Sequence, residues 1–116
     1  MDDLSPFLPL SPAALHILLA LSSEDRHGYG IMQEIARQSE GKYKPGPGTL
    51  YDNLQKLLNQ SMLEEVERRH AGEDERRRYY RLTRFGRRVL AAEVERLENV
   101  VRAAKTNLRP ATRRAV

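Results

Sequence analysis

Apolar residues recur at alternating intervals of four and three near the C-terminal end of the chain, and this pattern limits the possible folds more than any other feature. They are Leu90, Val94, Leu97, Val101, Ala104 and Leu108. This spacing is typical of a coiled-coil seam, in which the apolar side chains share one face of a helix. Thr83 is a suitable N-cap and Pro110 ends the pattern, so we expect a helix from residue 84 to about residue 108.

A helix of about 25 residues, with a rise of about 1.5 Å each, is longer than the body that the rest of this short chain can form. The stripe either covers the domain's own core or faces the same stripe of a second copy. We favour the second interpretation, because a helix with such a seam needs a partner helix. The six apolar residues are then the predicted interface of a homodimer.

A second informative helix is predicted after the alternating Pro and Gly residues at 45–48. From about Gly48 onward, leucines recur at helical spacing and form one apolar stripe. A rotation of about 100° per residue places polar residues on the opposite side, with Tyr51 on the flank. These polar residues are Thr49, Asp52, Asn53, Lys56 and Asn59. This side can bind base edges or phosphates, or it can be an ordinary solvated helix face, and the segment alone leaves both interpretations open.

Composition narrows the class of protein. The 116 residues suit one domain, and 20 basic against 16 acidic residues give a net charge of +4, which favours a polyanionic partner. Without cysteine the chain forms no disulfide, thiolate metal site or cysteine nucleophile. It has no apolar run of membrane-spanning length, and its acidic start, interrupted by Pro6, is unlike a secretory signal. We therefore expect a cytoplasmic protein without a membrane partner.

The remaining elements follow in chain order. Residues 1–10 are expected to form an arm, and Ser11-Pro12 to start a helix that runs to about residue 21. A second helix opens at His27, with Tyr29 on its apolar side and Glu34 on its polar side. Residues 42–44 fit a short strand. Strands are predicted at 62–69 and 76–82, as a hairpin with the charged tip 70–75.

Four sequence blocks resemble those of the PadR family of bacterial transcriptional regulators, in the family's order and spacing. They are Leu10-Ser11-Pro12 with residues 17–21, His27-Gly28-Tyr29-Gly30-Ile31-Met32, Gly46-Pro47-Gly48-Thr49-Leu50-Tyr51, and Arg77-Arg78-Tyr79-Tyr80-Arg81-Leu82-Thr83 followed by Gly86. The resemblance covers roughly residues 8–100. It implies a mainly α fold with a small β-hairpin: a winged helix-turn-helix domain at 11–83, a dimerisation helix at 84–109 and a basic tail at 110–116.

The resemblance further implies a homodimeric repressor that binds a pseudo-palindromic site in double-stranded DNA. Helix 47–60 would enter the major groove, and the wing at 68–78 would lie near phosphates. The residues expected at the DNA are Lys42, Lys44, Pro47, Gly48, Thr49, Tyr51, Asn53, Lys56, Arg76 and Arg77.

Some members of this family bind phenolic or flat hydrophobic effectors between their terminal helices, and the small ones use a tryptophan from each subunit. This chain has no tryptophan, and Phe85 is the aromatic residue of its terminal helix. A small hydrophobic or phenolic effector that relieves repression therefore stays open, without the tryptophan pocket that the resemblance implies for the small members.

Two other classes of function compete with DNA binding. A winged-helix module that binds another protein, without specific DNA binding, stays open as an alternative. An enzyme is not expected, because His16, His27 and His70 lack metal-ligand spacing and the glutamates of 64–75 lie among arginines. We expect no catalytic residues, metal or cofactor.

Overall fold

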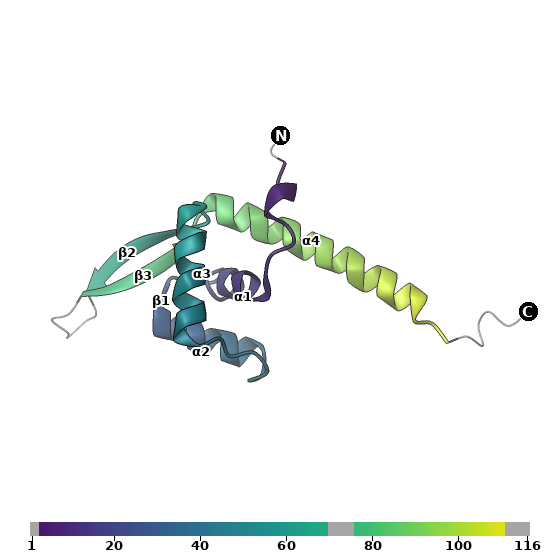
Figure 1. Cartoon of the computed structure of the whole chain (residues 1–116), viewed down its shortest axis with the longest axis horizontal. Coiled ribbons are helices and arrows are strands. Elements are labelled where there is room, and N and C mark those ends of the chain that lie inside the picture. Colours follow the sequence, from purple (N-terminus) through teal and green to yellow (C-terminus); the bar gives the residue numbers. More distant parts are fainter. Residues whose placement is uncertain (1–2, 70–75, 111–116) are drawn as a thin grey trace, which may run out of the picture.

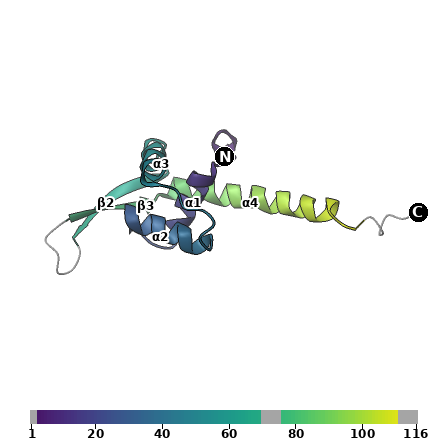
Figure 2. The ribbon, with the colours of Figure 1, turned by 60° about the horizontal axis from the view of Figure 1, so that its bottom comes forward.

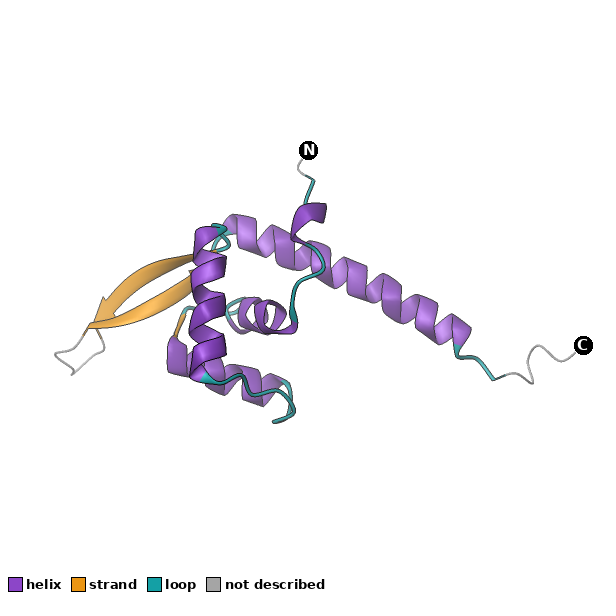
Figure 3. Ribbon diagram, in the orientation of Figure 1, coloured by secondary structure: helices purple, strands orange, loops and turns teal. Residues whose placement is uncertain are grey.

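The computed structural model describes residues 3–69 and 76–110, with the backbone alone for Arg69, Arg76 and Arg77. Figures 1 and 3 show short helices packed together beside a small sheet, and one long helix that projects from them. The elements are η1 Ser5–Phe7, α1 Pro12–Ala20, β1 Arg26–His27, α2 Gly28–Gln38, α3 Pro47–Asn59, β2 Leu63–Arg69, β3 Arg76–Leu82 and α4 Arg84–Asn107. The predicted winged-helix class and the hairpin are confirmed. The tip 70–75 and the tail 111–116 lie outside the described residues.

Side chains cap three of the helices at their first turns. The Ser11 hydroxyl accepts a hydrogen bond from the backbone N–H of Ala14 at 3.1 Å, and the Thr83 hydroxyl accepts one from Gly86 at 2.9 Å. His27 Nδ1 accepts one from Gly30 N–H at 3.0 Å, so the histidine is the cap of α2. Each cap satisfies an N–H that has no partner within the helix, which fixes where the helix begins.

The sheet has the order β1-β3-β2, and both pairings are antiparallel. In the hairpin, Leu63 pairs with Leu82 and Arg69 with Arg76. The two-residue strand β1 was not predicted, because a run so short has no periodicity to detect. The strand suggested at residues 42–44 is wrong: the chain there forms a turn and a loop. β1 already occupies the edge of β3 that such a strand would need.

The core is closed by α1, α2 and α3 against the base of the hairpin and the start of α4. Its fully buried side chains are Ile17, Leu18, Ile31, Ile35, Leu50, Leu54, Met62, Glu93 and Val89. The buried stripe of α2 runs through Ile31 and Ile35, so it is rotated about the helix axis relative to the predicted stripe. The prediction was therefore wrong at Tyr29 and at Glu34. Tyr29 is 62% exposed, whereas Glu34 is 8% exposed.

Helix α4 extends well beyond the rest of the chain (Figure 2). The molecule measures 72 × 37 × 23 Å, and its radius of gyration of 17.8 Å exceeds the roughly 13 Å expected for a compact chain of this length. Only the first turns of α4 are covered, and every residue from Glu98 to Pro110 is exposed. None of the helices in the described part of the chain has the length and hydropathy needed to cross a bilayer.

The predicted apolar stripe of α4 divides into two parts. Leu90 is 6% exposed and belongs to the chain's own core, which corrects its assignment to the exposed interface. Leu97 is half-buried, and Val94, Val101, Ala104 and Leu108 are exposed. Val100, which the heptad spacing did not include, is exposed beside them. The second half of the stripe therefore has no cover within the described chain.

The N-terminal arm lies against α4. The rings of Phe7 and Phe85 meet edge to face, with centroids 5.2 Å apart. The N–H of Leu10 donates to the buried carboxylate of Glu93 at 3.0 Å, and Arg96 donates to the same carboxylate at 2.6 and 3.0 Å. The hydrogen bonds from Arg96, followed by the one from Leu10, lower the pKa of Glu93. The described part of the arm is therefore fixed to the body.

Candidate nucleic-acid interface

Helix α3 lies with one face in the core and the other uncovered (Figure 1). Leu50, Leu54 and Leu57 are buried, as the leucine spacing predicts. A side-chain carbon built at Gly46 or Gly48 would have no neighbour within 4 Å, so the backbone at the start of the helix is open to a partner. The exposed residues among those predicted to contact DNA are Lys42, Lys44, Pro47, Gly48, Thr49, Tyr51 and Lys56.

Asn53 differs from these residues. Its side-chain N–H donates to the carbonyl of Thr49 at 2.8 Å, and it is half-buried on the flank that faces the arm. There it lines a hollow of about 180 Å³ together with Leu10 and Ser11. The side chain is therefore engaged on its own helix and turned away from the centre of the exposed face.

Gln55 is an exposed polar residue that the sequence interpretation did not single out. Its amide donates to Asn59 Oδ1 at 3.0 Å, one turn later along the exposed face of α3. Asp52 is exposed on the same face. Strict application of the 100° rotation would have placed Gln55 near this face. A paired Gln and Asn offer donors and acceptors of the kind that bind base edges.

Tyr51 is positioned by a glycine of another helix. A side-chain carbon built at Gly28 would lie 2.3 Å from the Tyr51 hydroxyl oxygen and 2.9 Å from the ring carbon beside it. Only glycine permits this approach, which joins the His27–Met32 block to the Gly46–Tyr51 block of the sequence. The first turn of α2 and the flank of α3 are therefore held in contact.

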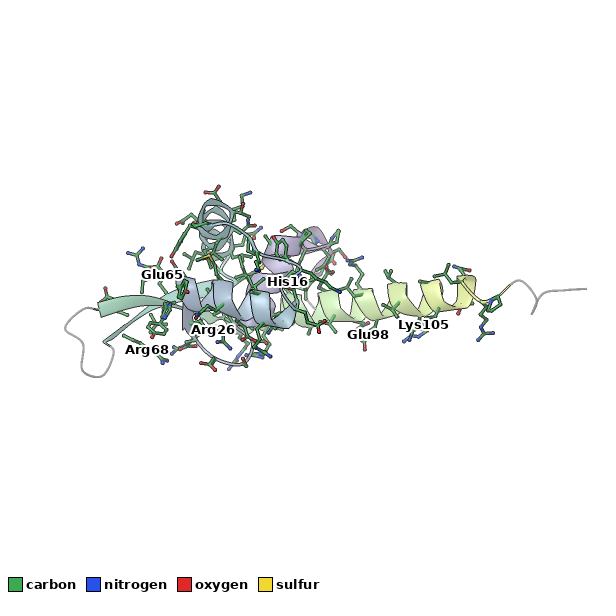
Figure 4. The ribbon with its side chains drawn as sticks, turned by 90° about the horizontal axis from the view of Figure 1, so that it is seen from below. His16, Arg26, Glu65, Arg68, Glu98 and Lys105 are labelled. Carbon is green, nitrogen blue, oxygen red and sulfur yellow. The ribbon has the colours of Figure 1, made fainter. Side chains whose placement is uncertain are left out.

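The wing, which is the hairpin of strands β2 and β3, has two faces that carry different side chains. Figure 4 shows Glu65 on the side of the wing where α3 lies and Arg68 on the opposite side. Arg78, which shares the face of Glu65 by strand alternation, approaches its carboxylate to 3.3 Å. Tyr80, on that face too, is buried, and burial, followed by the nearby charge of Glu65, raises its pKa.

The opposite face of the wing is tied to the body by Asp25. This carboxylate, with its side chain 15% exposed, pairs with Arg81 at 2.8 Å and with Arg68. The hydrogen bond to Asp25 raises the pKa of Arg81, so this cation is stabilised in the folded protein. Arg68 also lies over the ring of Tyr79, 5.5 Å from its centroid. The predicted contacts of Arg76 and Arg77 involve side chains outside the described structure.

No set of three His, Cys, Asp or Glu side chains within residues 3–69 and 76–110 is arranged to hold a metal ion. The titratable groups with the clearest shifts are instead held in ion pairs. Glu34 accepts hydrogen bonds from Arg37 and Gln38, and chiefly the bond from Arg37 lowers its pKa to about 2. Such pairing suits structure rather than proton transfer.

Comparison with known proteins identifies the fold. Residues 17–92 match the PadR-like family of transcriptional regulators. The chain belongs to this family. The resemblance predicted from the four sequence blocks is thereby confirmed, and the PadR match runs from the last turn of α1 through α2, α3 and strands β2 and β3 to the first turns of α4.

Relatives described as transcriptional regulators, and solved structures, agree with the assignment. Transcriptional regulator Rv3488 of Mycobacterium tuberculosis is 34% identical over 88 residues, which cover 76% of this chain and 78% of that protein. Transcriptional regulator YqjI of Escherichia coli is 41% identical over 49 residues, but the match spans only 24% of its length. A PadR-family regulator from Clostridium difficile superposes with a TM-score of 0.73 at 19% identity, covering 84% of this chain and 99% of that one.

Bacillus subtilis PadR, solved in complex with operator DNA, has the same fold. It superposes with a TM-score of 0.64 at 20% identity, over 74% of this chain and 48% of that chain. At this identity the likeness concerns the fold alone.

Proposed function

We propose that this PadR-family chain is a sequence-specific DNA-binding repressor that acts as a homodimer on a pseudo-palindromic operator. One observation carries the proposal: the outer face of α3 is polar and uncovered from its first turn to Asn59, while its other face closes the core. A helix presented in this way matches the recognition helix of a helix-turn-helix protein, which binds in the major groove. The complex of Bacillus subtilis PadR with operator DNA supports the same role for this fold.

The candidate DNA-contacting residues fall into two groups, cations for phosphates and polar groups for base edges. Lys42, Lys44 and Lys56 are exposed cations suited to phosphates. The open backbone at Pro47 and Gly48, with Thr49 and the amides of Gln55 and Asn59, is suited to base edges. Strands β2 and β3 extend from the body beside α3 (Figure 1), and the proposed wing contacts at 68–78 would be made with phosphates beside the groove.

The exposed apolar stripe of α4 supports the proposed self-association. This stripe, at Val94, Leu97 and Val101, borders a groove of about 470 Å³ that also includes Glu98 and Lys105. A second copy packed along this stripe would bury it and relate the two α3 helices by a two-fold axis. Binding to successive major grooves then requires α3 helices about 34 Å apart. A flat hydrophobic effector is not part of the proposal, because the chain has no tryptophan to stack on it.

The test is selection of DNA fragments by the purified protein, followed by gel retardation with the selected and random sequences. We expect a near-palindromic motif and a complex that contains two copies of the chain. Lys56→Ala should weaken binding to both DNAs and reduce the salt dependence of log K by about 0.9 for each subunit, because one phosphate contact is lost.

The opposite outcome would favour the interaction-module alternative. If no sequence is enriched over random DNA at moderate salt, while the α4 stripe holds a different protein in a stable complex, the repressor proposal is wrong.

A further inference from the structure

An open cleft of about 470 Å³ lies between the first turn of α2, the flank of α3 and strand β3. It is lined by His27, Gly28, Tyr29, Tyr51, Arg78 and Tyr80. Of these residues, Tyr51 was expected to contact DNA, and Arg78 belongs to the wing segment 68–78 that was expected near phosphates. Tyr80 is buried, whereas Tyr29 and Tyr51 are exposed at the cleft.

The exposed groups of the cleft are suited to an anion. Two phenolic hydroxyls, of Tyr29 and Tyr51, can donate hydrogen bonds, and the guanidinium of Arg78 supplies a permanent positive charge in a planar fork. The Arg78 side chain is 67% exposed, so its charge is accessible from solvent. Guanidinium groups bind phosphate oxygens through paired N–H donors, an arrangement stronger than a neutral hydrogen bond.

One acidic group opposes an anion at this place. Glu65 lies 3.3 Å from Arg78 and its side chain is 39% exposed. An ion pair between exposed groups contributes little, so a phosphate can replace the carboxylate as the partner of Arg78 at small cost. Glu65 would then weaken DNA binding, and its neutralisation would strengthen it.

The position of the cleft indicates which phosphate it can receive. It separates α3 from the wing, and a strand that borders the major groove must pass between these two elements when α3 lies in the groove. On the far side of the wing, Arg68 and Arg81 are held by Asp25. Among the wing side chains that the structure describes, Arg78 is thus the cation on the side of α3.

We propose that this cleft holds one backbone phosphate of the operator, with the charge supplied by Arg78 and hydrogen bonds by Tyr29 and Tyr51. The inference rests on the proposed DNA-binding function; it adds Tyr29 as a contact and assigns Arg78, which lies in the wing segment expected near phosphates, to one phosphate shared with Tyr29 and Tyr51. Because phosphates carry no base information, these contacts set the position of the protein on the duplex rather than its sequence preference.

The test combines protein variants with operator DNA in which single phosphates are replaced by neutral methylphosphonates. Wild-type protein should lose about tenfold in affinity when one particular phosphate in each half-site is neutralised. Arg78→Gln should bind the unmodified operator about tenfold more weakly and should lose its sensitivity at that same phosphate. The slope of log K against the logarithm of salt concentration should become less steep by about 0.9 for each subunit.

Further variants separate the role of each group. Arg78→Lys should keep most of the salt slope, because the charge is retained. Tyr29→Phe should weaken binding without changing the salt slope, and Glu65→Gln should strengthen it. Arg109→Gln is the matched control: it removes one exposed positive charge beyond the end of α4 and should leave the methylphosphonate profile unchanged. Thermal unfolding of each variant checks that the fold is intact.

Two failures can be told apart. If wild-type protein prefers the operator but Arg78→Gln and Tyr29→Phe bind as wild type, with an unchanged methylphosphonate profile, the cleft is not a phosphate site while the proposed function stands. If wild-type protein shows no preference for any sequence, the proposed function fails and the phosphate site falls with it.

Discussion

Gly28 and Gly86 lie where another segment leaves no room for a side chain, but the obstacles differ. At Gly28 the nearest atom is the hydroxyl of Tyr51, the far end of a half-exposed side chain. At Gly86 a side-chain carbon would lie 2.1 Å from the carbonyl oxygen of Met62, which is backbone. A tyrosine can swing aside, whereas the backbone at Met62 is fixed by its neighbours in the core.

Gly86→Ala should therefore reduce the free energy of unfolding by about 1–3 kcal/mol or more, because the chain must shift to relieve the overlap. Gly28→Ala should cost less stability, yet it should displace Tyr51 and weaken DNA binding. Urea unfolding and operator affinity of the two variants measure this contrast. Equal losses of stability would show that Tyr51 is as firmly held as the Met62 backbone.

Glu34 is a buried carboxylate whose partners come from its own helix and from β1. Arg37 donates to it at 2.9 Å, and Arg26 lies 3.7 Å from it. Its pKa is lowered from 4.5 to about 2, chiefly by the hydrogen bond from Arg37. Because the folded pKa is lower than the unfolded one, the ionised group stabilises the fold above pH 4.5, and this stabilisation is lost as the pH falls toward 2.

Replacement of Glu34 by Gln should remove this pH dependence. One pKa unit corresponds to about 1.4 kcal/mol, so the effect is about 3 kcal/mol at most, and less because Arg37 is exposed to solvent. The measurement is the free energy of unfolding of both proteins between pH 7 and pH 2. Parallel curves for wild type and variant would contradict the assignment.

The wing is a hairpin that leaves the body and is held at its base. β1 supplies two residues of pairing to β3, and Asp25 supplies ion pairs to a residue of each long strand, Arg68 and Arg81. Short two-stranded hairpins are only marginally stable alone. The orientation of the wing beside α3 thus depends on Asp25.

Asp25→Asn should loosen the wing without unfolding the body. We expect the amides of β2 and β3 to exchange with deuterium roughly tenfold faster, a change equal to about 1.4 kcal/mol. The reason is that Arg68 and Arg81 both lose their negatively charged partner. The core amides of α1 should be unaffected. Asp52→Asn removes the same charge from the exposed face of α3 and should leave wing exchange unchanged. Equal exchange in both variants would exclude an anchoring role for Asp25.

Helix α4 is long, and none of residues 3–69 and 76–110 covers its second half. Val94 and Val101 are exposed, and Val101 is 50% accessible to solvent. An apolar stripe of this kind on a projecting helix is unfavourable in water unless a partner covers it.

Val101→Asp should therefore separate the proposed dimer, because two charges would be buried in the interface. Sedimentation velocity should give the mass of one chain, 13.3 kDa, where wild type gives twice that value. Operator affinity should fall with it. Asn99→Asp places the same charge on another side of α4 and should stay dimeric. A wild-type protein that sediments as a single chain would remove the basis for the dimer.

The sequence predicted the buried face of α3 correctly and that of α2 only in part. Leu50, Leu54 and Leu57 are buried as predicted, since their spacing leaves one possible core face. Tyr29 and Glu34 of α2 were assigned to the wrong sides, because tyrosine is amphipathic and a carboxylate can be buried when it is paired, here with Arg37 and Arg26. Asn53 was expected at the exposed face, yet its bond to Thr49 and the nearby arm place it on the flank.

Local sequence patterns encode the order and type of the longer elements, and the family, because periodicity, caps and Pro-Gly punctuation act over a few residues. Contacts between segments far apart in the chain depend on the tertiary structure. They are the pairing of β1 with β3, the ion pairs of Asp25 with both wing strands, and the hydrogen bond of the arm to Glu93. The tertiary structure also brought Tyr29, Tyr51 and Arg78 to one cleft. Such contacts join residues that are distant in sequence, and no local pattern encodes them.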